Sequence, residues 1–396
     1  MKELKILHVF PDNKFLDVAF DVFDYLPYVS NEYVFYSTTK DYEFKYVKNT
    51  IRIKIETDIE EYKKLFCNPD IDVIFFHTLD FSKYEYLSWT DSTKVVVWSA
   101  WGYDIYHPIG EVYIVQLDLF KPLTHKLLFG TPPSLFKQLK RLVKRFLHIQ
   151  KEIDRIKKRR RLRKHIKQSI KRIDFCATVL NSEYDLLKNT PYFKSRSFYF
   201  KYFSKFPINT DTEVTYTAGN NILLGNSADP TNNHLDLLDI LQQLDISDRK
   251  VIMPLNYGDE NYKKQLLEKS TIGKNFYILD DFLPIVEYEK NFLSSSVAIY
   301  GHIRQQALGN IYMCVEQGIK VFLYKDSITY KQLKKDGYFI FEIENLTQKE
   351  IDIPLTEQEK EHNRKLYLQN FSADIFLDRF KSAVNEIRIE SERRKR

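Results

Sequence analysis

Short apolar runs, broken by turn residues, recur along this chain and constrain its fold more than any other feature. LKILHVF is followed by a Pro-Asp-Asn turn at 11–13, and YVFYS, IDVIFFH and KVVVWSAWG come after it. Runs of this length are typical of strands buried on both faces of a parallel sheet, and helical stretches such as DIEEYKKLF lie between them. The first half of the chain is therefore predicted to form an α/β domain.

A second series of the same kind follows a polar stretch at 209–221. Its apolar runs are NILLGNS, KVIMPLNYG, NFYILDDFL, VAIYG and IKVFLY, with helical stretches between them, as in a doubly wound sheet. A chain of 396 residues also exceeds what one hydrophobic core usually supports. We expect a first domain at 1–208, a linker at 209–221, a second domain at 222–355 and a helical tail at 356–396.

The three cysteines are widely separated and form no C-x-x-C pair. This spacing argues against a disulfide framework or a zinc site, and it favours a reducing compartment such as the cytoplasm. The N-terminal MKELKILHVF reads as a strand rather than a signal peptide, and no uncharged apolar run approaches the roughly 20 residues of a membrane span. The usual kinase, dinucleotide and hydrolase fingerprints are missing from the sequence.

Basic residues are concentrated at 134–172, where seventeen Lys and Arg face two acidic residues, although the net charge of the whole chain is +6. The segment contains no Pro or Gly, and its apolar residues predict one or two amphipathic helices. Such a helix suits an anionic membrane surface. A solvated surface helix and a nucleic-acid interface are the alternatives, but no recognised nucleic-acid-binding fold accompanies the segment.

The segment VAIYGHIRQQALGNIYMCVEQGIKVFLY at 297–324 reads as a strand, a polar loop, a helix and a second strand. The loop holds Gly301, His302 and Arg304, the helix begins near Gly309, and Gly318 ends it. A loop between a parallel strand and a helix N-terminus can bind an anionic ligand, so we expect a phosphate-bearing substrate here.

A similar transition from a strand through a loop to a helix is expected at GNSADPTNNH. Asp229 is a suitable N-cap and Pro230 suits the first helical position, so a helix is expected to begin there. Gly225, Asn226 and Ser227 would lie in the preceding turn and could contact a diphosphate. An ordinary strand-to-helix turn is the alternative interpretation.

Several of these segments together resemble one enzyme family. ILLGNSADPTNNHLDLL, VIMPLNYGDENYKKQL and IRQQALGNIYMCVEQGIKVFLYKD, together with VIFFHTLD and VVWSAWGYDIY in the first domain, resemble the 4-alpha-L-fucosyltransferase family, glycosyltransferase family 56. The likeness covers most of residues 70–345. It implies a GT-B fold, in which two Rossmann-like domains face a cleft. The basic segment is longer here than in the family.

The resemblance implies transfer of a deoxyamino sugar such as 4-acetamido-4,6-dideoxygalactose (Fuc4NAc), or of a fucose-like sugar, from a TDP-linked donor. The acceptor would be a polyprenyl-diphosphate-linked saccharide in surface polysaccharide synthesis, reached by a peripheral enzyme at the cytoplasmic side of the inner membrane. No cofactor is expected. A non-enzymatic protein that binds a nucleotide sugar, or a nucleic acid through the basic helix, is the rival hypothesis.

Arg304 is the expected stabiliser of the negative charge that develops on the TDP leaving group, because an enzyme of this type without a metal needs fixed positive groups there. The thymine base of the donor is expected near the Asp280–Pro284 turn, where Tyr288 or Phe282 could pack on it. The remaining residues expected on the donor side are Gly225, Asn226, Ser227, Asp229, Asn256, Gln305, Gln306, Gly309, Asn310 and Glu316.

The acceptor side is expected in the first domain, at the carboxyl ends of its strands. His8 and His77 end two strand runs, and Trp101, Gly102 and Asp104 follow another. If the reaction inverts the anomeric centre, Asp104 or His77 is the candidate general base, whereas a retaining reaction needs none. No metal site is expected, because the one Asp-x-Asp pattern considered, at 70–72, opens a strand at its amino end.

Overall fold

The computed structural model describes residues 3–13, 15–107, 112–130, 149–202, 219–269, 273–281 and 283–396. These residues form two compact units. Unit 1 comprises the described residues of the spans 1–116, 140–209 and 372–396, and unit 2 comprises those of 117–139 and 210–371. Both units are α/β structures whose strands run parallel, so the predicted fold class is confirmed.

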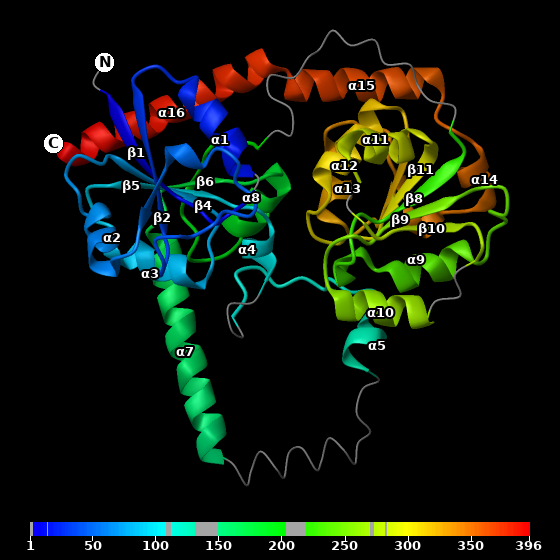
Figure 1. The fold of residues 1–396 in the computed structure, drawn as a ribbon, viewed down its shortest axis with the longest axis horizontal. Helices are drawn as coiled ribbons and strands as arrows, with labels where there is room; N and C mark the ends of the chain where they lie inside the picture. The colour runs from blue at the N-terminus through cyan, green and yellow to red at the C-terminus, as the bar shows by residue number, and fades with distance from the viewer. Residues whose placement is uncertain are drawn as a thin grey trace. The chain divides into compact units, whose positions relative to one another are not determined.

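Unit 1 is built on a seven-stranded sheet with the order β3-β2-β1-β4-β5-β6-β7, all pairs parallel (Figure 1). Its strands are β1 (Leu4–Val9), β2 (Val29–Tyr36), β3 (Ile53–Glu56), β4 (Val73–His77), β5 (Val95–Ser99), β6 (Phe175–Ala177) and β7 (Arg196–Ser197). Its helices are α1 (Phe15–Asp24), η1 (Thr50–Arg52), α2 (Ile59–Leu65), α3 (Phe81–Trp89), α4 (Tyr103–Tyr106), α7 (Ile149–Lys171), α8 (Asn181–Lys188) and α16 (Ala373–Lys395).

Unit 2 is built on a six-stranded parallel sheet with the order β10-β9-β8-β11-β12-β13. Its strands are β8 (Asn221–Leu224), β9 (Val251–Pro254), β10 (Phe276–Leu279), β11 (Ser295–Tyr300), β12 (Lys320–Leu323) and β13 (Phe341–Glu342). Its helices are α5 (Pro122–Phe129), η2 (Pro230–Asn232), α9 (His234–Leu241), α10 (Glu260–Lys269), α11 (Ile285–Leu293), α12 (Leu308–Glu316), α13 (Ile328–Lys335), η3 (Ile343–Asn345), α14 (Gln348–Asp352) and α15 (Glu357–Phe371).

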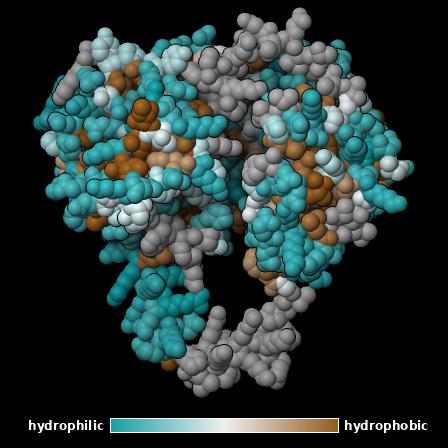
Figure 2. All heavy atoms as spheres, in the orientation of Figure 1, coloured by the Kyte–Doolittle hydropathy of each residue, from teal (hydrophilic) through white to brown (hydrophobic). Residues whose placement is uncertain are grey.

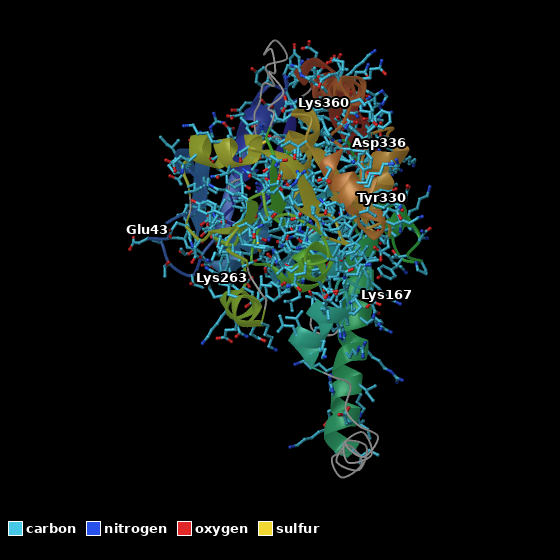
Figure 3. All side chains as sticks on the ribbon, turned by 90° about the vertical axis from the view of Figure 1, so that its right-hand side faces the viewer. Glu43, Lys167, Lys263, Tyr330, Asp336 and Lys360 are labelled. Carbon is cyan, nitrogen blue, oxygen red and sulfur yellow. The ribbon has the colours of Figure 1, made fainter. Side chains whose placement is uncertain are left out.

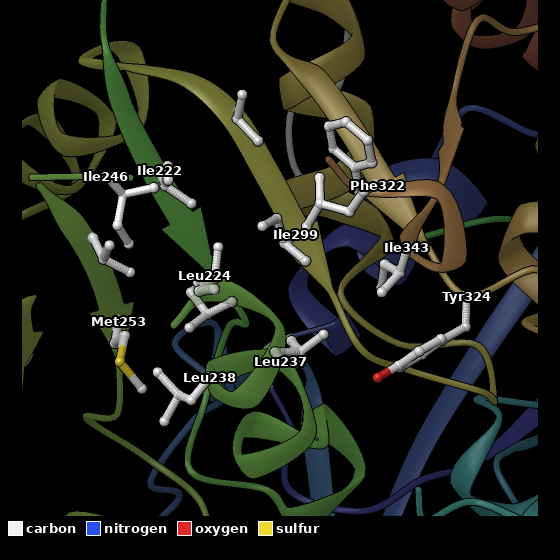
Figure 4. Close-up of a cluster of buried hydrophobic side chains, with 14 of the residues drawn as sticks. Ile222, Leu224, Leu237, Leu238, Ile246, Met253, Ile299, Phe322, Tyr324 and Ile343 are labelled. Atoms are coloured by element: carbon white, nitrogen blue, oxygen red, sulfur yellow. The ribbon is translucent and has the colours of Figure 1, made fainter. Parts of the chain in front are cut away.

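The strands are buried as the apolar runs predict. Every residue of β4, β5 and β9 is buried, which explains why these strands read as continuous apolar stretches rather than as alternating ones. In unit 2 one core cluster joins β8 and β11 to α9, and Figure 4 shows Leu224 and Ile299 packed near Leu237. A second cluster lies on the other face of the sheet, where Ile311 of α12 is fully buried.

The chain passes between the units more often than the predicted division at 209–221 implies. Residues 117–130 belong to unit 2, because Asp236 of α9 accepts hydrogen bonds from the Leu123 and Thr124 amides at the start of α5, at 2.8 and 2.9 Å. The helical tail is present but is shared. Its first helix, α15, packs on α12 of unit 2, whereas its second, α16, packs its Phe380 against the aromatic core of unit 1.

The described part of the basic segment is the helix α7, which extends away from the body of unit 1 (Figures 1 and 3). Its carboxyl-terminal half packs on α3 through the buried side chains of Ile166 and Ile170. The predicted helical character holds over this part. Residues 134–148 of the segment and 209–218 of the predicted linker lie outside the described residues.

Candidate active site

Two loops of unit 2 meet where its strand order reverses, between β8 and β11. In parallel sheets this point, at the carboxyl ends of the strands, is where ligands bind. The loops approach so closely that both glycines are required. Gly225 has a φ of +70°, and a Cβ added at Gly301 would lie 2.2 Å from the Asn232 carbonyl oxygen. The two loops are the ones that the sequence predicts to bind the donor.

Two asparagines that sequence reasoning missed hold these loops together. Asn232 donates from Nδ2 to the carbonyl oxygens of Ser227 and Asp229, both at 3.0 Å, and its Oδ1 accepts from the Asn226 amide at 3.1 Å. Asn233 donates to the Gly301 carbonyl oxygen at 2.7 Å. A sequence signal existed in the Asn-Asn pair before the helix, because asparagine tolerates the left-handed conformation that position 233 adopts, with a φ of +54°.

The helix start predicted after Asp229 is partly wrong. Asp229 does cap the turn, since its side chain accepts from the Thr231 amide at 2.9 Å, but that turn is the three-residue 3₁₀ helix η2. The left-handed Asn233 interrupts the backbone, and α9 begins at His234. The helix dipole expected behind Gly225 to Ser227 is therefore one short turn, and it supplies less positive potential than an α-helix would.

Arg304 and Gln306 join the second loop to the first. Nη2 of Arg304 lies 3.8 Å from Oδ2 of Asp229, and Nη1 donates to the Gln305 carbonyl oxygen at 3.0 Å. Gln306 donates to Oδ1 of Asn226 at 3.4 Å. The guanidinium is nine-tenths buried, so its charge acts in a medium of low dielectric constant. The structure thus brings Asn226, Asp229, Arg304 and Gln306 together.

The N-terminus of α12 lies directly after this loop. Ala307 precedes the helix in the left-handed conformation, with a φ of +56°, and no side chain of the described residues caps the first turn. A Cβ added at Gly309 would meet no atom within 4 Å, so this turn faces open space. Asn310 donates to the Tyr288 hydroxyl at 3.0 Å. The backbone N–H groups of the first turn are thus placed to donate hydrogen bonds to an anionic ligand.

The other donor-side residues are placed differently. Asn256 follows β9, and its neighbour Tyr257 accepts from Nδ2 of Asn226 at 2.8 Å, so this strand end joins the same group. Glu316 is the last residue of the nine-residue helix α12, about 12 Å along its axis from the loop. The structure does not bring Glu316 together with the strand-end loops. Phe282 lies outside the described residues.

Two buried histidines support the donor-side loops. Nε2 of His302 lies 2.7 Å from Oδ1 of Asn232, and because that oxygen is a pure acceptor the imidazole carries its proton on Nε2. Burial lowers the pKa of His302 well below its usual range, and the nearby charge of Arg304 acts in the same direction. Burial also lowers the pKa of His234 to about 3. Both rings are therefore neutral at pH 7 and add no positive charge to the site.

Asp104 of unit 1 is a junction between two strand-end loops. Its Oδ2 accepts from the Thr78 hydroxyl, the Leu79 amide and the Trp98 indole at 2.8 to 3.0 Å, and its Oδ1 accepts from the Trp101 amide at 2.9 Å. Burial raises the pKa of this carboxyl, and the four hydrogen bonds act in the opposite direction. With its lone pairs so engaged, Asp104 is suited to fixing the loops after β4 and β5, not to accepting a substrate proton.

His77 lies in a buried hydrogen-bond chain. Its Nε2 is 2.9 Å from Nδ1 of His8, its Nδ1 contacts the Tyr202 hydroxyl, and Nε2 of His8 is 3.0 Å from Oδ1 of Asn31. Because the Asn31 oxygen is an acceptor, each proton position follows: His8 donates to Asn31, His77 donates to His8, and Tyr202 donates to His77. Both nitrogens of His77 are engaged. The geometry therefore favours a positioning role over that of general base.

The remaining sequence expectations concern metals and membranes. In the described ranges no group of three or more His, Cys, Asp or Glu side chains is arranged to hold a metal ion. Across the same ranges, none of the helices combines the length and apolar character that crossing a membrane requires.

Solved structures share this architecture at low sequence identity. They include a glycosyltransferase from Rickettsia africae ESF-5, with 13% identity over 98% of both chains and a TM-score of 0.55. The alpha,alpha-trehalose 6-phosphate synthase from Burkholderia multivorans is 9% identical over 98% of this chain and 99% of its own, with a TM-score of 0.54. AviGT4, a glycosyltransferase involved in avilamycin A biosynthesis, is 7% identical over 97% and 98%, with a TM-score of 0.51. Such likeness shows the fold, which is of the GT-B type.

The sequence itself matches a family model. The model describes the 4-alpha-L-fucosyltransferases, glycosyl transferase group 56, and it matches residues 157–386, which is more than half of the chain. The match spans most of α7, the strands β6 and β7 of unit 1 and the whole described sheet of unit 2, including both donor-side loops and α12. The chain therefore belongs to the 4-alpha-L-fucosyltransferase family and is a glycosyltransferase.

Proposed function

We propose that this glycosyltransferase moves a deoxyamino or fucose-like sugar from a TDP-linked donor to a lipid-linked saccharide, without a divalent metal. Membership of the family implies a nucleotide-sugar donor and an acceptor. The observation that carries the proposal is the uncapped first turn of α12, which faces open space at Gly309, next to the buried charge of Arg304. A diphosphate is the part of the donor that these groups complement.

The chemistry of the proposed reaction requires this positive potential. When the bond between the sugar and the phosphate breaks, negative charge grows on the TDP oxygens, and preorganised N–H groups and a cation lower the barrier most where water is excluded. Arg304 is held 3.8 Å from Asp229, which is longer than a direct hydrogen bond. A phosphate oxygen could therefore take the place of the carboxylate at Nη2 without breaking the bond from Nη1 to the Gln305 carbonyl oxygen.

Turnover of TDP-sugars in the presence of EDTA tests the proposal. We expect hydrolysis or transfer to persist in EDTA and to fall by about 100-fold or more in Arg304→Ala, in the range found when one charge-stabilising group is removed. Arg249→Ala is the matched control, because Arg249 is equally buried and is paired with Asp352 at 3.0 Å at the amino end of β9. Absence of turnover with every TDP-sugar, or equal turnover in the two variants, would contradict the proposal. A non-enzymatic binder would bind TDP without turnover.

We also propose that α7 docks the enzyme on an anionic membrane surface, where a lipid-linked acceptor would be found. Eleven Lys and Arg lie along the helix against Glu152 and Asp154. Figure 2 shows this protruding helix as largely hydrophilic, yet the side chains of Ile149, Ile153 and Ile156 are 38–52% exposed along one face. An exposed apolar stripe among cations is typical of helices that lie in a membrane interface.

Liposome flotation tests this docking. We expect the protein to float with vesicles that contain phosphatidylglycerol, to be released by 1 M salt, and to lose binding in the double variant Ile153→Ser and Ile156→Ser. Ile389→Ser on α16, where the side chain is 59% exposed, is the matched control and should float like the unchanged protein. If flotation depends neither on lipid charge nor on salt, the docking of α7 is refuted. The proposed transferase activity would be unaffected by that result.

A further inference from the structure

Three aromatic side chains gather at the carboxyl edge of the unit 1 sheet. Phe15 begins α1, Trp101 follows β5 and Tyr202 follows β7, so they come from three separate parts of the chain. Their ring centroids are 5.5 Å apart for Phe15 and Trp101, 5.6 Å for Phe15 and Tyr202, and 5.5 Å for Trp101 and Tyr202. Phe15 is 37% exposed, and the other two are half-buried. We call this group the aromatic platform.

The aromatic platform stands directly over the switch point of its sheet. The strand order of unit 1 reverses between β1 and β4, and the last residues of these strands include the hydrogen-bonded pair His8 and His77. The Tyr202 hydroxyl donates into this pair, and Phe200 packs on the Tyr202 ring with centroids 4.7 Å apart. The ring of Tyr202 is thus fixed both at its polar end and on its side. A switch point is where parallel sheets bind ligands, and here it is lined with aromatic rings.

The two histidines beneath the aromatic platform are uncharged. Burial lowers the pKa of His8 to about 3, and the pKa of His77 is lowered well below its usual range by burial, with smaller effects from His8 and Lys83. Lys83 is itself paired with Asp80. The chain from Asn31 to Tyr202 therefore carries no charge at pH 7, which does not suit a phosphate but does suit an uncharged, hydroxylated ring with an apolar face.

We propose that Phe15, Trp101 and Tyr202 form a subsite for a pyranose ring of the acceptor saccharide, and that His77 and His8 position the Tyr202 ring. The inference rests on the proposed function and names the part of the acceptor that unit 1 binds. The C–H face of the sugar packs on the exposed face of Phe15, and the half-buried rings close the side of the subsite. Aromatic rings recognise sugars at low entropic cost because they have only two rotatable side-chain bonds.

Saturation-transfer NMR with methyl pyranosides tests the subsite directly. The probes are the methyl β-glycosides of glucose, galactose, N-acetylglucosamine and N-acetylmannosamine. We expect at least one probe to receive saturation from the unchanged protein, and Phe15→Ala to weaken its binding roughly fivefold or more, as lost stacking predicts. Phe15→Tyr, which keeps the ring, should restore binding. No saturation of any probe by the unchanged protein, or equal binding by Phe15→Ala, would overturn the proposal.

Tyr25→Ala is the matched control. Tyr25 directly follows α1 and is 55% exposed, whereas Phe15 begins that helix, about 15 Å away along its axis. Its removal should leave pyranoside binding unchanged. If Tyr25→Ala also lost pyranoside binding, the proposed subsite would be refuted, because removal of any exposed ring of unit 1 would then have the same effect.

Tyr202→Phe tests the positioning role, because it keeps the ring and removes the bond to His77. The subsite predicts a rise in the apparent KM for transfer to a saccharide that exceeds any change in the rate of TDP-sugar hydrolysis, in which water replaces the saccharide. A variant whose hydrolysis and transfer fall together would contradict the assignment of Tyr202 to the acceptor. Hydrolysis that is absent from the unchanged protein would instead count against the proposed function, so the two failures are distinguishable.

Discussion

Acidification from pH 7 to pH 5 should destabilise both units through their buried histidines. His8 and His234 are fully buried, and burial lowers the pKa of each from 6.5 to about 3. In the unfolded chain these imidazoles bind protons below pH 6.5, while the folded protein excludes those protons until about pH 3. The stabilising contribution is therefore complete above pH 6.5 and is lost as the pH falls from that value toward 3.

The magnitude follows from the two pKa values. Between pH 7 and pH 5 a group with pKa 6.5 unfolded and about 3 folded lowers the free energy of unfolding by about 2 kcal/mol. Unit 1 should lose this amount through His8, and unit 2 through His234. His77 and His302 act in the same direction, because burial lowers their pKa values as well. Asp104 acts in the opposite direction, since burial raises its pKa.

Urea unfolding at pH 7, 6 and 5, followed by circular dichroism, measures this loss. His234→Gln should reduce the pH dependence of the free energy of unfolding by about 2 kcal/mol over this range, whatever its effect at pH 7. His125→Gln, the same substitution at an exposed position of α5, is the matched control. A free energy of unfolding that stays constant between pH 7 and pH 5 would refute the reasoning.

Three substitutions test tertiary contacts within the units. Gly301→Ala would place a Cβ 2.2 Å from a backbone oxygen that cannot rotate away, so it should cost about 1–3 kcal/mol or more and abolish TDP binding, measured by thermal unfolding and calorimetry. Asp236→Ala removes the acceptor for two α5 amides and the Thr124 hydroxyl, should cost about 1–2 kcal/mol, and should speed proteolysis within α5, whereas Asp239→Ala on the same helix should not. Asp104→Asn, which keeps the size but loses an acceptor, should destabilise unit 1 while TDP binding persists, and unchanged stability would exclude its role as a junction.

The sequence predicts the sheets well because a buried parallel strand leaves a local signature. VIFFH and VVVWS are buried at every residue, and their short length and their β-branched and aromatic residues favour a strand over a helix. Because each strand can be located from its own residues, the loops after β8 and β11 could be predicted as donor-binding loops. Strand order is not local, but the carboxyl ends of all parallel strands share one edge, so residues that follow strands are candidates whatever the order.

What the sequence could not predict depends on contacts between distant residues. Nothing near Asp236 signals that it caps a helix more than a hundred residues earlier in the chain. Asp104 and His77 read as bases because they follow strands, but their partners, Thr78 and Tyr202 among them, are visible only after folding. The aromatic platform was missed for the same reason, since Phe15 and Tyr202 carry no motif and meet through tertiary structure alone.

Both units place a buried, neutral histidine at the switch point of the sheet, and this bears on the pH dependence of activity. At each switch point a neutral, buried imidazole links the strand-end loops, His77 in unit 1 and His302 in unit 2. Each imidazole makes its hydrogen bonds without placing a charge at the switch point: His77 bonds through both ring nitrogens, and His302 donates from Nε2 to Asn232. Because neither ring titrates in the folded protein near neutrality, neither produces an inflection in kcat/KM between pH 6 and pH 8. An inflection in that range that disappeared in His302→Gln, with TDP binding intact, would show that this imidazole titrates in the working enzyme and that its role is chemical rather than structural.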